Sequence, residues 1–204
     1  MTNKEELLYD IFKKKFSFII ENNEELKKKI NYIQNYNFNI LLYSKYGFPL
    51  DLFLDELIKK KYNIKNEIYR TEIIWNKNII YNENKFFFEI DLMNPLLPKD
   101  FNFLNNFIIT ILKTKNILFD KHLIIIKHIN ILRNQFSILK ILLEKFSNNV
   151  FFICTTYNIS NIECAILSRF TYFRIPLFTT QEIETIFKKY LNIDLNKYLI
   201  ENRC

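Results

Sequence analysis

Residues 44–51 are the first place in the chain where residue types and spacing suggest chemistry. They include the only glycine, Gly47, and lie between a predicted strand at residues 39–43, apolar from residue 40 on, and an amphipathic stretch at residues 50–62. A buried strand, a turn and the start of a helix bring backbone N–H groups together where an anion can bind. This order of elements therefore indicates a site of the kind that holds phosphate.

The loop departs from the nucleotide-binding pattern G-x-x-x-x-G-K-[ST]. In that pattern backbone N–H groups cradle the phosphates, the lysine reaches the β- and γ-phosphates, and the hydroxyl holds Mg²⁺. Here Pro49 removes an amide donor, Leu50 removes the cation, and Asp51 places a carboxylate against the phosphates. The degenerate loop contains Ser44, Lys45, Gly47, Pro49, Leu50 and Asp51. We expect it neither to bind nor to hydrolyse a nucleotide.

A second apolar run, residues 123–126, ends where such ATPases carry an Asp-Glu pair that coordinates Mg²⁺ and activates water. The residues at these positions are Lys127 and His128. We interpret His128 as a surface histidine at a strand end and not as a catalytic base. The sequence thus predicts a degenerate acidic pair, no enzymatic activity of the chain's own, and no bound cofactor or metal.

Residues 140–176 resemble the small subunits of the replication factor C clamp loader, an AAA+ family. Residues 140–146 stand where that family has a helix ending in Met-Glu-Lys-Tyr, and residues 149–156 match its sensor-1 strand. Ser168 and Arg169 then match a Ser-Arg-Cys motif that precedes a strand and a proline. The order and the spacings agree, and the wider resemblance covers about residues 40–182.

The resemblance implies a P-loop NTPase-like, AAA+ subunit of a ring that loads a sliding clamp onto primer–template DNA. It implies that Arg169 acts in trans as an arginine finger, with Ser168 fixing the helix end, while partner subunits bind ATP and magnesium. Arginine suits this role because its planar fork binds phosphate oxygens in pairs. Without the resemblance, both residues would be interpreted as a helix end with a cation near the last carbonyls.

Two further positions depart from the family. Phe170 replaces the cysteine of Ser-Arg-Cys, and Tyr157 stands at the sensor-1 asparagine position, with Asn158 adjacent. We assign residues 1–178 to a degenerate AAA+ core and residues 179–204 to the start of a helical lid, with the family's collar domain absent. Two β-type runs within residues 67–92 resemble an insertion found in some eukaryotic-type subunits.

Alternating strands and helices must position these residues. Helical periodicity predicts helices at residues 2–20, 24–33, 50–62, 100–118, 134–146, 161–167 and 180–191, with Asp100 as a cap. Apolar runs predict strands at residues 38–43, 68–75, 86–90, 122–126, 150–154 and 172–175, with Asn-rich turn material between the second and third. This pattern predicts a mostly parallel α/β sheet with helices on both faces and a short helical C-terminal extension.

Composition narrows the function classes. The net charge of +7 is compatible with a nucleic-acid partner, but the lysines are scattered over helices that also carry glutamate. The odd number of cysteines (Cys154, Cys164 and Cys204) and the two histidines argue against a zinc site. No signal segment and no apolar run of roughly 18 residues is present, so we expect an intracellular protein without membrane contact. With the resemblance, this means a DNA-replication compartment, nuclear or in a viral factory.

Two hypotheses from different classes follow. The first is a non-catalytic clamp-loader-like subunit whose partners are other clamp-loader subunits, the sliding clamp and primer–template DNA, with residues 100–118 facing the clamp. The alternative is an AAA+-derived scaffold or a DNA- or protein-binding module without an ATP-dependent ring. Stable copurification with ATPase subunits distinguishes the two.

Overall fold

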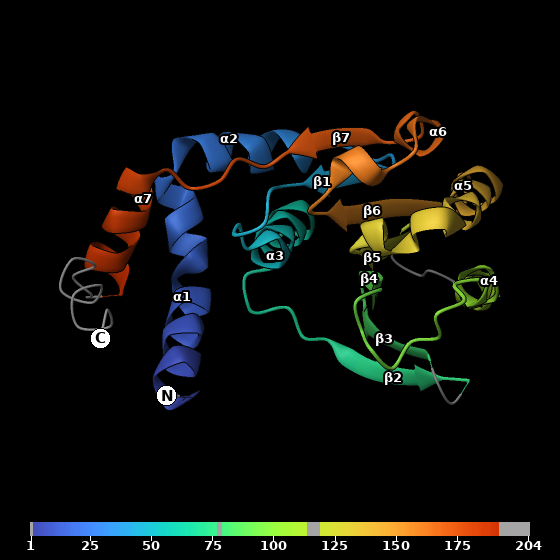
Figure 1. Ribbon diagram of the computed structural model, residues 1–204, viewed down its shortest axis with the longest axis horizontal. Coiled ribbons are helices and arrows are strands. Elements are labelled where there is room, and N and C mark those ends of the chain that lie inside the picture. Colours follow the sequence, from blue (N-terminus) through green and yellow to red (C-terminus); the bar gives the residue numbers. More distant parts are fainter. Residues whose placement is uncertain (1, 77–78, 114–118, 192–204) are drawn as a thin grey trace.

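The computed structural model describes residues 2–76, 79–113 and 119–191 (Figure 1). Its α-helices are α1 (Thr2–Asn22), α2 (Glu24–Ile33), α3 (Leu50–Tyr62), α4 (Phe103–Lys113), α5 (Phe136–Lys145), α6 (Cys164–Leu167) and α7 (Thr180–Thr185). Its strands are β1 (Ile40–Tyr43), β2 (Thr71–Trp75), β3 (Ile79–Asn84), β4 (Phe87–Asp91), β5 (His122–Lys127), β6 (Val150–Thr156) and β7 (Thr171–Arg174). The shorter helical turns are η1 (Ile129–Gln135), η2 (Ile159–Asn161) and η3 (Ile186–Tyr190).

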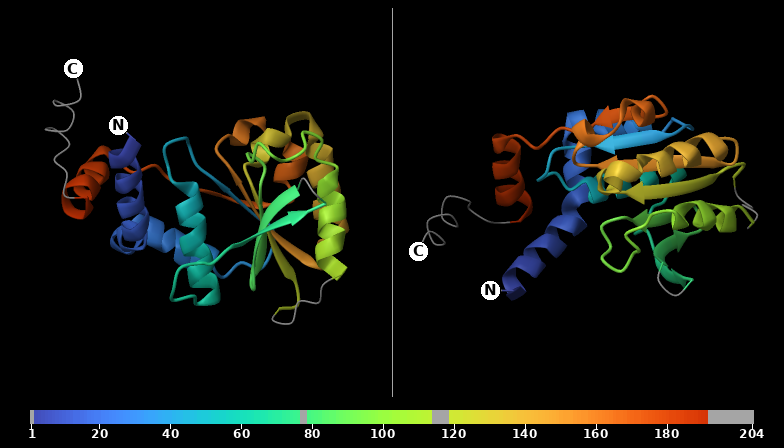
Figure 2. Two further views of the ribbon diagram at one scale, coloured as in Figure 1. Left: turned by 90° about the horizontal axis from the view of Figure 1, so that it is seen from below. Right: turned by 45° about the vertical axis from the view of Figure 1, so that its right-hand side comes forward.

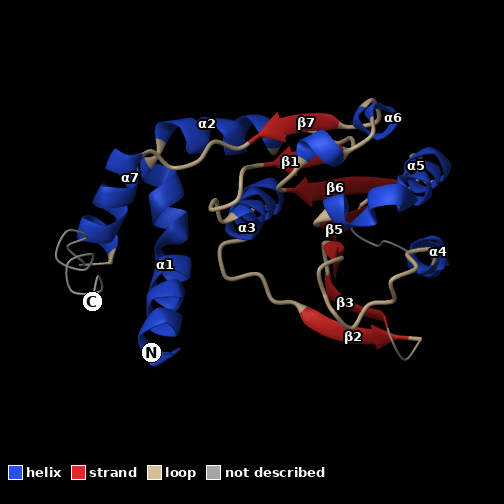
Figure 3. Ribbon diagram, viewed as in Figure 1, coloured by secondary structure: helices blue, strands red, loops and turns tan. Residues whose placement is uncertain are grey.

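The strands form one sheet in the order β2-β3-β4-β5-β6-β1-β7, which Figure 3 shows in red. Strands β4, β5, β6, β1 and β7 pair in parallel, while β3 pairs antiparallel with both β2 and β4. The prediction of a mostly parallel sheet is confirmed. Because parallel strands share one direction, the loop after β1 and the residues that end β5 lie at the same edge.

Helices cover both faces of this sheet (Figure 2). Ile40 and Leu42 point into a core that also contains the buried side chains of α1, α2 and α3, whereas Leu41 points into a second core with α4, α5 and α6. Strands buried on both faces need apolar side chains at every position. This is why β1, β5 and β6 read as continuous apolar runs, and the predicted covering of both faces is confirmed.

One strand was missed, because the segment predicted as Asn-rich turn material contains β3. The side chains of its asparagines have hydrogen-bond partners in neighbouring segments, so they do not end the strand. The Nδ2 of Asn82 donates to Glu89 at 3.4 Å, and the Nδ2 of Asn84 donates to the carbonyl of Tyr69 at 2.6 Å. The insertion therefore consists of three strands and not of two β-type runs.

Three predicted helix starts are wrong. The helix expected from residue 161 begins at Cys164, because Ile159–Asn161 form a separate 3-10 turn. The helix expected from residue 134 begins at Phe136, after the 3-10 turns of η1 and a kink at Arg133, whose φ is 43°. The carboxylate of Asp100 accepts the N–H of Asn102 at 3.1 Å in a local turn, so it does not cap α4, which begins at Phe103. Residues 114–118 of that predicted helix lie outside the described residues.

The C-terminal extension begins with a capping box, in which Thr179 and Glu182 bond each other's backbone N–H groups ahead of α7. Helix α7 lies beside α1 (Figure 1), and the rings of Phe18 and Tyr190 are 6.1 Å apart. The described part of the predicted lid thus packs on the N-terminal helices. The boundary at residues 178 and 179 stays a prediction, and residues 192–204, with Cys204, lie outside the described residues.

Candidate functional site

The loop after β1 is folded onto the protein's own core. The hydroxyl of Ser44 is buried and donates to the carbonyl of Ile175 at 2.9 Å. Gly47 has a φ of 99°, which reverses the chain so that Phe48 and Leu50 enter the core beneath α3. Leu50, which stands where the nucleotide-binding sequence pattern has its lysine, is buried in this core, while Lys45 is exposed.

Tyr157, directly after the neighbouring strand β6, packs against this loop. Its phenol donates to the carbonyl of Phe48 at 3.1 Å and accepts the N–H of Leu50 at 3.3 Å, and its ring stacks on Tyr46 at 5.0 Å. The first N–H groups of a helix are those that bind an anion, and one of them is already occupied here. Burial is the main cause that raises the pKa of Tyr157, so the phenol stays protonated at neutral pH.

Asp51 and Lys127 form an ion pair at the same edge, with 3.4 Å between the carboxylate and the ammonium. Asp51 lies in the first turn of α3, where the helix dipole favours a negative charge. Lys127 lies 3.2 Å from Glu89; burial lowers its pKa, but Glu89 and Asp51 raise it more, so the pKa is raised overall. The charges are reversed relative to a nucleotide site, which carries its cation on the helix and its acids on the strand.

Glu89 pairs with Lys127 and also with Arg70, which extends the ion pairs into the interior. The sequence analysis did not predict a role for Glu89 or Arg70. The side chain of Glu89 is only 2% exposed, and it accepts from Nε and Nη2 of Arg70 at 3.1 and 3.0 Å. Arg70 also pairs with Asp55 on α3, and these carboxylates raise its pKa despite burial. The available signal was the single acid in the apolar run of residues 86–90, because a buried carboxylate requires a cationic partner.

The interpretation of His128 as a surface residue is wrong, since the residue is only 8% exposed. A left-handed backbone, with a φ of 57°, turns its ring inward beside Tyr157, and its Nδ1 lies 2.8 Å from Asp91. Burial acts to raise the pKa of Asp91, but the hydrogen bond to His128 and the N–H of Met93 lower it more. The pKa of Asp91 is therefore below its usual value.

Ser168 and Arg169 lie at the other edge of the sheet, just before β7 begins. The Nε of Arg169 donates to Glu144 at the end of α5 at 3.1 Å, and a second guanidinium nitrogen bonds the carbonyl of Ala165. The hydroxyl of Ser168 donates to the same carbonyl at 3.0 Å, while Phe170 is buried. The predicted residues thus form two groups, one at each edge.

The thiol of Cys154 is buried, which raises its pKa, whereas Cys164 is exposed. In the part of the chain that the structure describes, no group of three or more His, Cys, Asp or Glu residues is placed to hold a metal ion. None of the described helices is both long enough and apolar enough to cross a membrane.

No family model and no curated protein matches the sequence. Among solved structures, the chain is similar to a DNA polymerase III gamma subunit-related protein from Thermotoga maritima, with 12% identity and a TM-score of 0.51 over 81% of this chain and 50% of that one. It is also similar to two RuvB variants from Thermotoga maritima, at 16% and 15% identity and TM-scores of 0.48 and 0.49, over 82% of this chain and 49% and 50% of theirs.

The chain thus spans about half the length of these structures. The sheet order and the likeness to the first of them confirm the predicted fold class, a mostly parallel α/β fold of the P-loop NTPase-like type. At 12% identity, this likeness shows the fold alone.

Proposed function

We propose that this chain is a non-catalytic, clamp-loader-like subunit that joins AAA+ ATPase subunits and supplies Arg169 to the ATP site of a neighbour. The observation that carries the proposal is the series of ion pairs from Asp51 through Lys127 to Glu89 and Arg70, at the edge where a P-loop protein holds phosphate and magnesium. The sequence resemblance around Ser168 and Arg169 supplies the role in trans.

Binding a triphosphate at this loop would oppose the existing contacts. The phosphates would meet the carboxylate of Asp51, and they would need the N–H of Leu50 that Tyr157 already occupies. Drawing Lys127 toward the phosphates would leave Glu89 with one cation fewer in a buried position, which is costly. We therefore infer that ATP and Mg²⁺ are held by partner subunits and not by this chain.

Arg169, unlike the loop of residues 44–51, could bind a phosphate that a neighbouring subunit holds. Its carboxylate partner Glu144 has a side chain that is 51% exposed, and surface pairs of this kind contribute at most about 1 kcal/mol. A phosphate that accepts two parallel guanidinium hydrogen bonds can therefore replace Glu144 at small cost. Loss of the contact with Glu144 would free the guanidinium group of Arg169 to contact the phosphoryl group that is transferred in the neighbour's ATP site.

The decisive measurement is steady-state ATPase turnover of a reconstituted assembly with wild-type or Arg169→Ala chains. An essential arginine finger contributes on the order of 10³–10⁵ in rate, so turnover and clamp loading should fall sharply. Arg169→Lys should fall nearly as far, because a point charge lacks the fork. Arg174→Ala is the matched control, since Arg174 is an exposed arginine on the next strand. After equal incorporation, unchanged turnover for Arg169→Ala would make it a structural helix-end cation.

Calorimetric titration with Mg-ATP tests the inactive loop in the isolated chain. We expect no binding that depends on magnesium, because the charges at Asp51 and Lys127 are reversed. Micromolar, magnesium-dependent binding that is lost on substitution of Lys45 or Lys127 would contradict this proposal.

The sliding clamp and primer–template DNA are the further partners that we propose. The apolar side of α4 is used in the protein's own core, through Leu104, Phe107 and Ile108, so a clamp would contact its outer side and the preceding loop. That loop exposes Met93 and Leu96. Crosslinking of the assembly that placed this segment away from the clamp would remove the assignment.

A second candidate function is an AAA+-derived scaffold or binding module without an ATP-dependent ring. The contacts of Arg169 favour it, because Glu144 and the Ala165 carbonyl already satisfy this side chain within the chain. Such a protein would not copurify with ATPase subunits, whereas the clamp-loader-like subunit would.

A further inference from the structure

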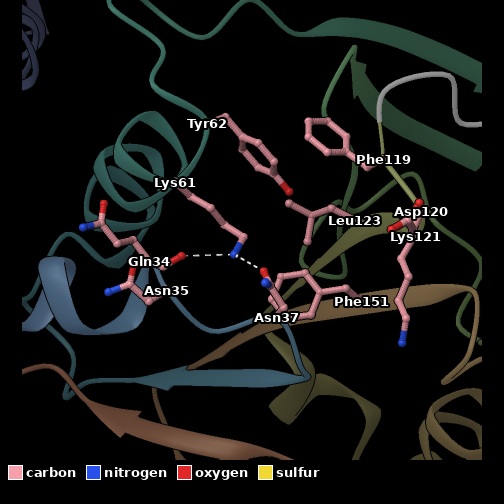
Figure 4. Close-up of a pocket in the computed structure, with 10 residues that line it drawn as sticks. All are labelled: Gln34, Asn35, Asn37, Lys61, Tyr62, Phe119, Asp120, Lys121, Leu123 and Phe151. Atoms are coloured by element: carbon pink, nitrogen blue, oxygen red, sulfur yellow. Dashed lines mark hydrogen bonds between the residues drawn. The ribbon is translucent and has the colours of Figure 1, made fainter.

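A cavity of about 530 Å³ opens at the amino ends of β5 and β6, at the edge of the sheet opposite the loop of residues 44–51 (Figure 4). Four parts of the chain line it: three residues after α2, the last turn of α3, the segment that leads into β5, and one residue of β6. The lining residues are Gln34, Asn35, Asn37, Lys61, Tyr62, Phe119, Asp120, Lys121, Leu123 and Phe151. Its volume is in the range of sites that hold small organic ligands. No residue of the proposed ATPase-related role takes part in it.

Aromatic rings form one wall and the floor of this cavity. Tyr62 stacks on Phe86 at 5.0 Å with 20° between the ring planes, and Phe119 lies 5.1 Å from Tyr62. Phe151 lies in the floor, with the ammonium of Lys61 5.2 Å from its ring centre. Aromatic faces of this kind bind flat rings by stacking.

The polar rim offers both hydrogen-bond donors and acceptors. Lys61 donates to the carbonyls of Gln34 and Tyr36 at 3.1 and 2.6 Å and to Oδ1 of Asn37 at 2.9 Å, which uses its three protons and fixes the rim. Among the described residues, neither Nδ2 of Asn37 nor the hydroxyl of Tyr62 has a hydrogen-bond partner. The rim can therefore recognise a ring edge that carries both kinds of group.

The charges around the cavity are positive overall. Lys61 and Lys121 line it together with a single acid, Asp120. Aromatic faces, an amide on the rim and a positive balance form the combination that binds bases and their phosphates. A purely apolar ligand would leave the amide of Asn37 and the hydroxyl of Tyr62 unpaired on binding, which disfavours it.

We propose that this cavity binds a nucleobase, stacked on Tyr62 and bonded at its edge by Asn37. The base comes either from a free nucleotide or from an unpaired position of a single strand, since both present the same ring. The proposal is independent of the role of Arg169. Binding of the base to this cavity does not require magnesium.

The test is titration of the full chain, without magnesium, with the four ribonucleoside monophosphates and separately with a short single-stranded oligonucleotide. Stacking contributes about 1–3 kcal/mol per base, so Tyr62→Leu should weaken binding at least about fivefold, whereas Tyr62→Phe keeps the ring and most of the affinity. Binding of the oligonucleotide alone would identify a single strand as the source. Tyr46→Leu is the matched control, because Tyr46 is a 72% exposed tyrosine at the opposite edge.

A second readout in the wild-type protein covers the case in which Tyr62→Leu does not fold. Nuclear Overhauser contacts between base protons and the Tyr62 ring are expected in the complex. Absence of binding by both probes, or binding that gives no such contacts and is equally strong in the Tyr62→Leu and Tyr46→Leu proteins, would overturn the proposal.

Discussion

The two edges of the sheet each contain a partly buried lysine, but the two lysines have opposite surroundings. Lys127 faces the carboxylates of Glu89 and Asp51, whereas Lys61 faces the neutral oxygens of residues 34–37. Burial lowers the pKa of Lys61, while at Lys127 the carboxylates outweigh burial and the pKa is raised. The edge at which open α/β sheets bind ligands is therefore filled by the protein's own charges, and the other edge keeps a cavity.

Glu89→Gln should have the largest effect and tests whether the ion pairs stabilise the edge that contains Lys127. The substitution keeps the shape of the side chain but leaves Arg70 and Lys127 without a carboxylate that both share. Breaking a buried ion pair in this way costs about 3–5 kcal/mol. Urea denaturation measures the loss, and Glu72→Gln, at an exposed position on β2, should change stability by less than about 0.5 kcal/mol. Equal, small effects would mean that the ion pairs do not hold this edge together.

Lys61→Met probes the other edge and should have a smaller effect. It removes three hydrogen bonds, but water can reach the freed oxygens through the cavity, so we expect a loss of about 1–2 kcal/mol at pH 7. Because the folded pKa of Lys61 lies below 10.5, the unfolded chain holds the proton more tightly. Wild-type stability should therefore rise relative to Lys61→Met as the pH approaches 10.5.

Lys127→Met sharpens this contrast. The folded pKa of Lys127 lies above 10.5, so its stabilising charge should be lost as the pH rises beyond that value. Denaturation curves at neutral and alkaline pH compare the two variants. The same direction of change for both lysines would contradict the assignment of their surroundings.

The smallest expected effect concerns Asp91, whose carboxyl pairs with His128. Its folded pKa lies below 3.8, so its contribution is present above about pH 4 and is lost as the pH falls through the folded value. The side chain is partly exposed, which limits the contribution to less than about 1 kcal/mol. Wild type should lose more stability than Asp91→Asn between pH 6 and pH 3. Asp10→Asn, at an exposed position on α1, should follow wild type.

The central strands could be predicted from the sequence because burial on both faces requires apolar side chains at every position. The runs at β1, β5 and β6 show this directly, and their order along the chain predicts the parallel sheet. Strand β3 could not be recognised in the same way. Its asparagine side chains form hydrogen bonds to Glu89 on β4 and to the carbonyl of Tyr69. Local composition does not show that these partners exist.

The candidate site likewise contains features that could be predicted from the sequence and features that could not. The reversed charges at Asp51 and Lys127 were visible as departures from a known pattern, because each stands at a fixed distance from a strand. The hydroxyl of Tyr157 on the loop, the inward turn of His128 and the partners of Glu89 were not visible. These contacts join positions far apart in the chain, so only the folded arrangement reveals them.

The buried ring of Phe170 has a consequence for Arg169, the residue before it. With Ile166 also buried on the same turn, the backbone on both sides of the arginine is anchored in the core before any partner arrives. Ordering a free loop residue costs roughly 1–2 kcal/mol of backbone entropy, and that cost is here already met by folding. A neighbouring subunit would have to displace Glu144 and restrict the side-chain rotations of Arg169, but it would not have to order the backbone.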